Sequence, residues 1–267
     1  MKKSVIKKKK DSLLSVHQQS EWLTENIRLT AFTKANPETP EKWWESVISG
    51  QPTQRITRPF YSDIGPFENG LMQLSIQPQL SQLYRIDWLY TPNPQLSYDN
   101  GLPNIGYLDE VVKKFSLNIE NWLTLAPPIN RLAFGAGLIR PVADIAVGNM
   151  YIAKYLKSIQ IDDETSSDFL YQINRPRFSK LHGLEYLKIN RLSKWSVVIM
   201  QGFEFALSGQ MLSVSPAEKL LQSECKLEID INTNPQPTGD LPHNKIKSVF
   251  KELVDLGIEI TKKGDIK

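Results

Sequence analysis

Two short blocks of this chain recur in the same order in its second half, and this recurrence constrains the fold more than any other feature. Residues 28–32 (RLTAF) resemble residues 131–134 (RLAF). Residues 86–95 (IDWLYTPNPQ) resemble residues 229–236 (IDINTNPQ). Each second block precedes a turn-rich loop and then a segment with helical spacing of its apolar residues. Ordered self-similarity is the mark of a repeated unit, so we expect two copies of one architecture.

The residue patterns predict the same element order in both halves. In the first half we expect a strand at 27–33, a helix from Pro40 with Thr39 as its N-cap, strands near 53–60, 70–77 and 83–91 with a break at 63–66, and a helix over 108–123. In the second half we expect a strand at 129–135, a helix over 142–158 with Met150 on its buried face, strands at 168–175, 184–192, 195–207 and 225–231, and a helix over 246–260.

These elements predict an α+β fold, in which two β-α-β(n)-α repeats build one curved antiparallel sheet with helices on one face. The first repeat spans 21–128 and the second 129–267, together as one continuous domain. The two blocks lie 59 residues apart in the first half and 99 apart in the second. We therefore expect an added β-hairpin to enlarge the second repeat.

This predicted arrangement resembles the duplicated saddle of the TATA-binding-protein type, in which two repeats join into one curved antiparallel sheet. The resemblance concerns the fold alone, because the nucleic-acid-binding residues of that family have no counterparts that we can place. Fold analogy does not transfer function.

The charge of the chain is unevenly distributed. Residues 1–10 hold six lysines and no acid, and removing them leaves 26 basic and 29 acidic residues. A body without excess positive charge does not favour nucleic acid by bulk electrostatics. We expect residues 1–20 to be a disordered lysine-rich tail. The alternative is a tail that contacts nucleic acid or an acidic surface.

No familiar catalytic, metal or cofactor motif is present. The single cysteine and the three dispersed histidines form no zinc pattern, and the sequence has no phosphate-binding loop, dinucleotide loop or nucleophile elbow. We therefore assign no catalytic residue, metal ligand or cofactor. The apolar runs are too short to span a membrane, and no signal peptide follows the lysines, so we expect a cytoplasmic protein.

Residues 172–195 are the most distinctive local segment. The triplet Ile-Asn-Arg occurs in it at 173–175 and again at 189–191. A turn at His182-Gly183 would place Asn174 opposite Arg191 in an antiparallel hairpin. Aromatic residues are interleaved among its basic residues, as in a single-strand nucleic-acid surface or a protein interface. The candidate binding residues are Arg175, Arg177, Phe178, Tyr186, Lys188, Arg191, Lys194 and Trp195.

Two acidic residues, Asp87 and Asp230, occupy matching places in the second blocks, and Arg28 and Arg131 do so in the first. If the sheet pairs them, we expect two structural ion pairs. The alternative is a pair of carboxylates at a binding or catalytic site.

Part of the chain also resembles an uncharacterised, sporadically distributed family of bacterial hypothetical proteins. The resemblance lies in residues 171–175 (YQINR) and in residues 227–231 (LEIDI) with the terminal helix. It implies a bacterial intracellular protein from a variable locus of the defence or mobile-element kind, and it implies no known activity.

Together these features favour a non-enzymatic binding or assembly subunit that holds a protein partner through residues 172–195. Exposed sheet edges would also allow self-association. One alternative is a nucleic-acid-binding protein that uses the lysine-rich tail and the same hairpin. Another is an enzyme with a dispersed site of aspartates and arginines.

Overall fold

The structure, a computed structural model, describes residues 21–80, 82–96, 102–162, 166–208, 211–235 and 239–266, apart from the side chains of 200–208 and 211–221. The tail expected at residues 1–20 lies outside these residues. The elements are, in chain order, β1 (Leu23–Thr33), α1 (Pro40–Val47), β2 (Gln54–Ile56), β3 (Tyr61–Phe67), β4 (Gly70–Pro78), β5 (Tyr84–Pro92), α2 (Leu108–Leu125), β6 (Arg131–Val142), α3 (Ile145–Ala153), β7 (Leu170–Asn174), β8 (Arg177–Phe178), β9 (Lys188–Ser208), β10 (Met211–Thr233), a 3-10 turn (His243–Lys245) and α4 (Ile246–Lys263).

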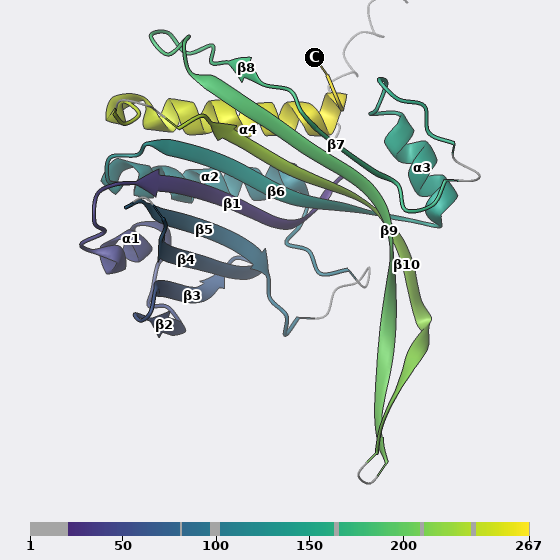
Figure 1. Cartoon of the computed structure of the whole chain (residues 1–267). Helices are drawn as coiled ribbons and strands as arrows, with labels where there is room; N and C mark the ends of the chain where they lie inside the picture. The colour runs from purple at the N-terminus through teal and green to yellow at the C-terminus, as the bar shows by residue number, and fades with distance from the viewer. Residues whose placement is uncertain are drawn as a thin grey trace, which may run out of the picture.

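The described strands form one curved antiparallel sheet, as expected (Figure 1). Its order is β2-β3-β4-β5-β1-β6-β10-β9-β7, and β8 pairs with β9 beyond the end of β7. The first strand of each half, β1 or β6, lies at the centre, where Arg28 is opposite Gly135. A Cβ on Gly135 would lie 2.8 Å from Nε of Arg28, so glycine gives this arginine room to lie across the neighbouring strand.

The helices pack on one face of this sheet, with α2 and α4 side by side behind the central strands (Figure 1). Both long helices lie where the sequence predicts them, because their apolar residues recur at helical spacing and are buried. Helix α4 ends at Gly264, whose φ of 76° suits a residue without a side chain. Helix α1 begins at Pro40 after Thr39, although the Thr39 side chain makes no capping hydrogen bond.

Several expected boundaries are wrong: the strand expected at 184–192 begins only at Lys188, and the one expected at 225–231 is the end of β10. The break at 63–66 is part of strand β3, and Pro66 is tolerated because β2 pairs with β3 only over residues 62–64. The break near residue 193 is also absent, since β9 is held extended there by β7 on one side and β10 on the other. Helix α3 begins later than expected, since β6 extends to Val142 and the Asp144 side chain caps the helix by accepting a hydrogen bond from the Val147 N–H. Met150, which was expected on the buried face of this helix, is 48% exposed.

The core is a continuous cluster of buried residues that draws on both halves. In the first half Trp88 of β5 stacks on Trp44 of α1 and meets the edge of Trp122 of α2. In the second half Trp195 of β9 stacks on Tyr155, which follows α3. Large aromatic side chains therefore join helices and sheet in both halves, within a cluster that is otherwise mostly Ile, Leu and Val.

Candidate functional site

Residues 170–196 include an antiparallel pairing of β7 and β8 with β9, as the repeated Ile-Asn-Arg triplet indicates. The expected register is wrong by one residue, because Asn174 lies opposite Leu192 and not opposite Arg191. The two triplets still meet: the Arg191 N–H donates to the Asn174 side-chain oxygen at 2.9 Å. A one-residue shift exchanges the faces of a strand, so the pairing alone could not show which side chains face the helices.

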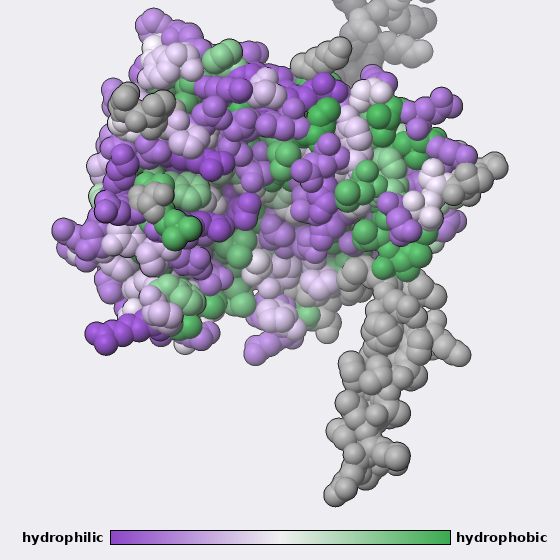
Figure 2. Space-filling view, viewed as in Figure 1, coloured by the Kyte–Doolittle hydropathy of each residue, from purple (hydrophilic) through white to green (hydrophobic). Residues whose placement is uncertain are grey.

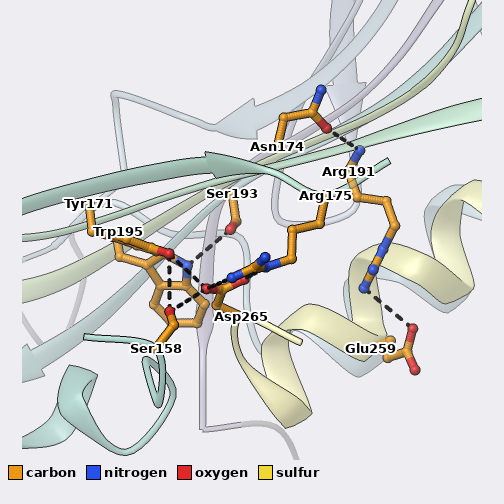
Figure 3. Close-up of polar contacts among 9 residues, drawn as sticks. All are labelled: Ser158, Tyr171, Asn174, Arg175, Arg191, Ser193, Trp195, Glu259 and Asp265. Carbon is orange, nitrogen blue, oxygen red and sulfur yellow. Dashed lines mark hydrogen bonds and ion pairs between the residues drawn. The ribbon is translucent and has the colours of Figure 1, made fainter. Parts of the chain in front are cut away.

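Arg175 faces inward and forms a two-pronged ion pair with Asp265, which follows α4 (Figure 3). The Asp265 side chain is 1% exposed and also accepts hydrogen bonds from Ser158 and Tyr171, each at 2.7 Å. The Arg175 hydrogen bond, assisted by these hydroxyls, lowers the pKa of Asp265 from 3.8 to about 2. Arg175 is therefore occupied in joining β7 to the end of α4.

Arg191 and Arg177 share one carboxylate, that of Glu259 on α4, at 3.5 and 3.2 Å. Figure 3 shows the contact of Arg191. Arg191 is 3% exposed, and burial together with nearby Arg177 lowers its pKa. Burial alone would raise the pKa of Glu259, but the Lys263 hydrogen bond and the two arginines lower it overall. The three arginines expected to contact a partner are thus paired within the molecule.

Two further residues of the predicted binding set are also engaged. Trp195 is fully buried, and its indole N–H donates to Ser193 at 3.1 Å, which corrects the expectation that its ring is available to a partner. Lys194 forms an ion pair with Glu228 at 2.9 Å. Odd-numbered residues of β9 face the helices, so Trp195 belongs to the core for the same reason that Arg191 does.

The rest of the set remains at the surface. Phe178 is 61% exposed, Tyr186 is 64% exposed, and Lys188 is exposed. Lys188 lies opposite Phe178 in the pairing of β8 with β9. The segment therefore keeps a small aromatic and cationic surface, without the arginines that would have dominated it.

One of the two ion pairs expected between the aspartates and arginines of the matching blocks is present, and the other is not. Arg28 contacts Asp230 at 3.6 Å, across β6, whereas Asp87 pairs with Arg85 at 2.7 Å and accepts a hydrogen bond from Thr30. Arg131 donates to Asn232 at 2.8 Å. Asp87 lies opposite Thr30 and Asp230 lies opposite Gly135. Three strand spacings separate β5 from β10, about 14 Å, so the two carboxylates do not share a site.

The face of the sheet opposite the helices has a polar hollow of about 430 Å³ over β1, β6, β10, β9 and β7. Its charges are matched: besides Arg28 with Asp230, Lys226 pairs with Glu25 at 2.8 Å and Lys194 with Glu228. Asp87 does not line it. A hollow with paired charges presents neither an isolated nucleophile nor a net charge for a ligand.

The feature that the sequence reasoning missed is a long ribbon formed by β9 and β10. β7 pairs with β9 only as far as Ser196, and β6 pairs with β10 only as far as Ser223. Beyond these points the two strands pair only with each other among the described residues, and they project from the sheet (Figure 1). We call this projection, residues 197–222, the arm. Twelve strand residues correspond to a length of about 40 Å.

The sequence of the arm carries the signal that would have revealed it. Phe203, Phe205 and Leu207 alternate with other residues before Gly209, and Leu212 and Val214 alternate after it. The register places Phe205 opposite Val214 and Leu207 opposite Leu212. Apolar residue types therefore occupy positions that share one face of the ribbon. The whole arm contains three charged residues, Glu204, Glu218 and Lys219.

The surface around the base of the arm is also apolar (Figure 2). Helix α3 has no charged residue, and its Val147 and Met150 are 37% and 48% exposed. Gly148, between them, would contact Val197 of β9 if it had a Cβ, so α3 packs directly on the start of the arm. Ile199, two residues further along β9, is 50% exposed.

Metal and membrane sites are not evident in the part of the chain that the structure describes. No group of three or more histidine, cysteine or acidic side chains in these ranges is arranged to hold a metal ion. No described helix is both long and apolar enough to cross a membrane. Comparison of the chain with protein-family models, with curated proteins and with solved structures finds no match.

Proposed function

We propose that this protein is a non-enzymatic assembly subunit of a multi-protein system in the cytoplasm and that it holds a protein partner through the arm. The observation that carries the proposal is the departure of β9 and β10 from the sheet beyond Ser196 and Ser223. Two-stranded ribbons are marginally stable in water, and each strand of the arm has an edge without a neighbouring strand among the described residues. A partner that adds a strand or packs on the apolar positions would satisfy both features.

A protein partner fits the arm better than nucleic acid does. Nucleic-acid surfaces rely on several lysines and arginines for phosphate contacts, and the arm has one lysine, Lys219, and no arginine. The arginines at 175, 177 and 191, which would have supplied such contacts nearby, are paired with Asp265 and Glu259. The apolar side of α3 beside the base of the arm extends the surface that a protein could cover.

We further propose that the arm is an enlarged hairpin in the second of two repeated units. Both halves run strand, helix, four strands, helix, and their first strands, β1 and β6, meet at the centre of the sheet. In that comparison β9 and β10 correspond to β4 and β5, which have nine residues each, against 21 and 23. The enlargement would then lie at 197–222, not at 172–195.

Site-specific photo-crosslinking in cells of the native host tests the proposed partner. A crosslinking residue at position 205 in the arm is compared with one at position 113, an exposed lysine on α2. We expect a discrete protein adduct from position 205 and none from position 113. Mass spectrometry then identifies whether the captured protein is another chain or a second copy of this one.

Two outcomes would overturn the proposal. One is an adduct with nucleic acid or lipid from position 205 in place of protein. The other is equal protein capture from positions 205 and 113, since that would mean that the arm has no selective contact.

A further inference from the structure

A second hollow lies on the helix side of the molecule, between α4 and the segment from β8 to Leu181. Its volume is about 650 Å³, and it is independent of the arm. We call it the α4 groove. Its walls carry five basic side chains and three acidic ones, and Leu181, Leu256 and Ile258 contribute apolar surface.

Contacts with the β8 side occupy two of the three acids of the α4 groove. Glu252 accepts hydrogen bonds from the Ser179 hydroxyl at 2.5 Å and from the Lys180 N–H at 2.7 Å. Glu259 pairs with Arg177 at 3.2 Å and with Lys263 at 3.1 Å. These contacts join β8 to α4, so both walls of the groove are fixed in place before any ligand arrives.

The basic side chains that remain are those of Lys180, Lys251 and Lys262. All three are exposed, and none forms an ion pair with another described residue. Among the acids of the groove, Glu259 has ion pairs, Glu252 has hydrogen bonds alone, and Asp255 has neither with a described residue. With five basic and three acidic residues, the lining of the groove has a net charge of +2. Positive charge beside an apolar floor selects a ligand that carries both acidic and apolar groups.

We propose that the α4 groove binds an acidic peptide segment of a partner protein, with leucine-like side chains on the floor and carboxylates toward the three lysines. A single-stranded nucleic acid would match the charge, but such ligands are held by stacking on aromatic rings, and no aromatic side chain is among the lining residues. An extended or helical peptide needs only apolar contact and charge pairing, and the groove supplies both.

Fluorescence anisotropy with the full chain tests this site. The probe is a labelled ten-residue peptide that alternates glutamate with leucine, and a labelled single-stranded oligonucleotide of ten bases is titrated in parallel. We expect the peptide to bind, and its affinity should fall as salt is added, because part of the attraction is electrostatic. We expect the oligonucleotide to bind at least about tenfold more weakly.

Charge-reversed variants locate the binding. The double variant Lys180→Glu/Lys251→Glu should weaken peptide binding at least about tenfold, and the matched variant Lys113→Glu on α2 should leave it unchanged. All three positions are exposed, so circular dichroism should show the same fold in each variant. Three results would each overturn the proposal. They are a failure of the peptide to bind at low salt, an equal loss of peptide affinity in the Lys113→Glu variant, and tighter binding of the oligonucleotide than of the peptide. None of these results bears on crosslinking from position 205.

Discussion

The hairpins β4–β5 and β9–β10 differ in how much of their length the rest of the fold uses. In β4–β5, β3 and β1 flank the two strands over most of their length, and the turn follows where this pairing ends. In β9–β10, twelve residues of each strand extend past the last neighbouring strand. The β4–β5 hairpin shows how long two such strands must be to pair within the sheet. The additional length of β9 and β10 is therefore not explained by pairing within the sheet.

The two halves also differ in what joins sheet to helices. The first half relies on tryptophans, with Trp88 between Trp44 and Trp122. The second half adds ion pairs between strand arginines and the end of α4 to its aromatic contacts. Removing one partner of a buried ion pair leaves an uncompensated charge, so the contact between sheet and helices should depend on pH in the second half.

The largest effect should come from the hairpin that lies wholly within the sheet. Trp88→Ala removes a fully buried ring from β5 and should lower the free energy of unfolding by about 3–5 kcal/mol. Urea denaturation followed by fluorescence of the remaining tryptophans measures the change. A loss below about 1 kcal/mol would contradict the view that β4–β5 is part of the essential core.

The next effect concerns Asp265, whose carboxylate holds Arg175. Asp265→Asn should cost about 2 kcal/mol at pH 7, because the folded pKa is about 2 against an ordinary value of 3.8. Since the pKa is lowered on folding, this stability is present above about pH 4 and is lost as the pH falls toward 2. Denaturation measures the free energy of unfolding of both proteins at pH 7 and at pH 3. The difference between the variant and the unmodified protein should be smaller at pH 3. A cost independent of pH would contradict the assigned ion pair.

A smaller effect, of opposite sign, is expected at the base of the arm. Glu224 is 3% exposed and lies opposite Val198 and Pro141, and burial raises its pKa. Because the folded pKa is raised, the charged form costs stability as the pH rises above the ordinary value of 4.5. Glu224→Gln should raise Tm at pH 7 and leave it nearly unchanged at pH 4. A lower Tm at pH 7 would mean that the carboxylate has a stabilising partner.

The smallest effect should follow removal of the arm itself. Replacing residues 200–222 by Asn-Gly joins Ile199 to Ser223, which already lie opposite each other, through a two-residue turn. We expect Tm to change by only a few degrees, because no described strand of the body pairs with the removed residues. Thermal unfolding with Trp88→Ala as the reference checks this order. Unfolding of the shortened chain would show that the arm contributes to the core.

The helices and the general class of the fold could be predicted because their signals are local. Each turn of α2 or α4 places the next apolar residue on the same side of the helix, whatever the rest of the chain does. The strands are also recognisable from the sequence, although its pattern wrongly predicts breaks at Pro66 and Ser193. Neighbouring strands, which a single segment does not reveal, keep the chain extended at both places.

The candidate site could be predicted only in part, because its residues come from distant segments. The repeated triplet located the pairing of β7 with β9, but a shift of one residue decided which side chains meet the helices. Arg175 meets Asp265 across 90 positions of sequence, and no local pattern marks either residue as the partner of the other. The arm had a clear alternating pattern, yet its projection depends on where β6 and β7 stop.

The sequence by itself determined the secondary structure elements that repeat locally, the absence of a recognisable catalytic motif and the near neutrality of residues 197–217. Only the tertiary structure decided that the arginines of 175–191 are neutralised by α4 and the residues after it, that Trp195 is in the core, and that β9 and β10 leave the sheet. The physical reason is one of range: helical periodicity arises within a few residues, whereas strand register and charge pairing are set by packing between segments far apart in the chain.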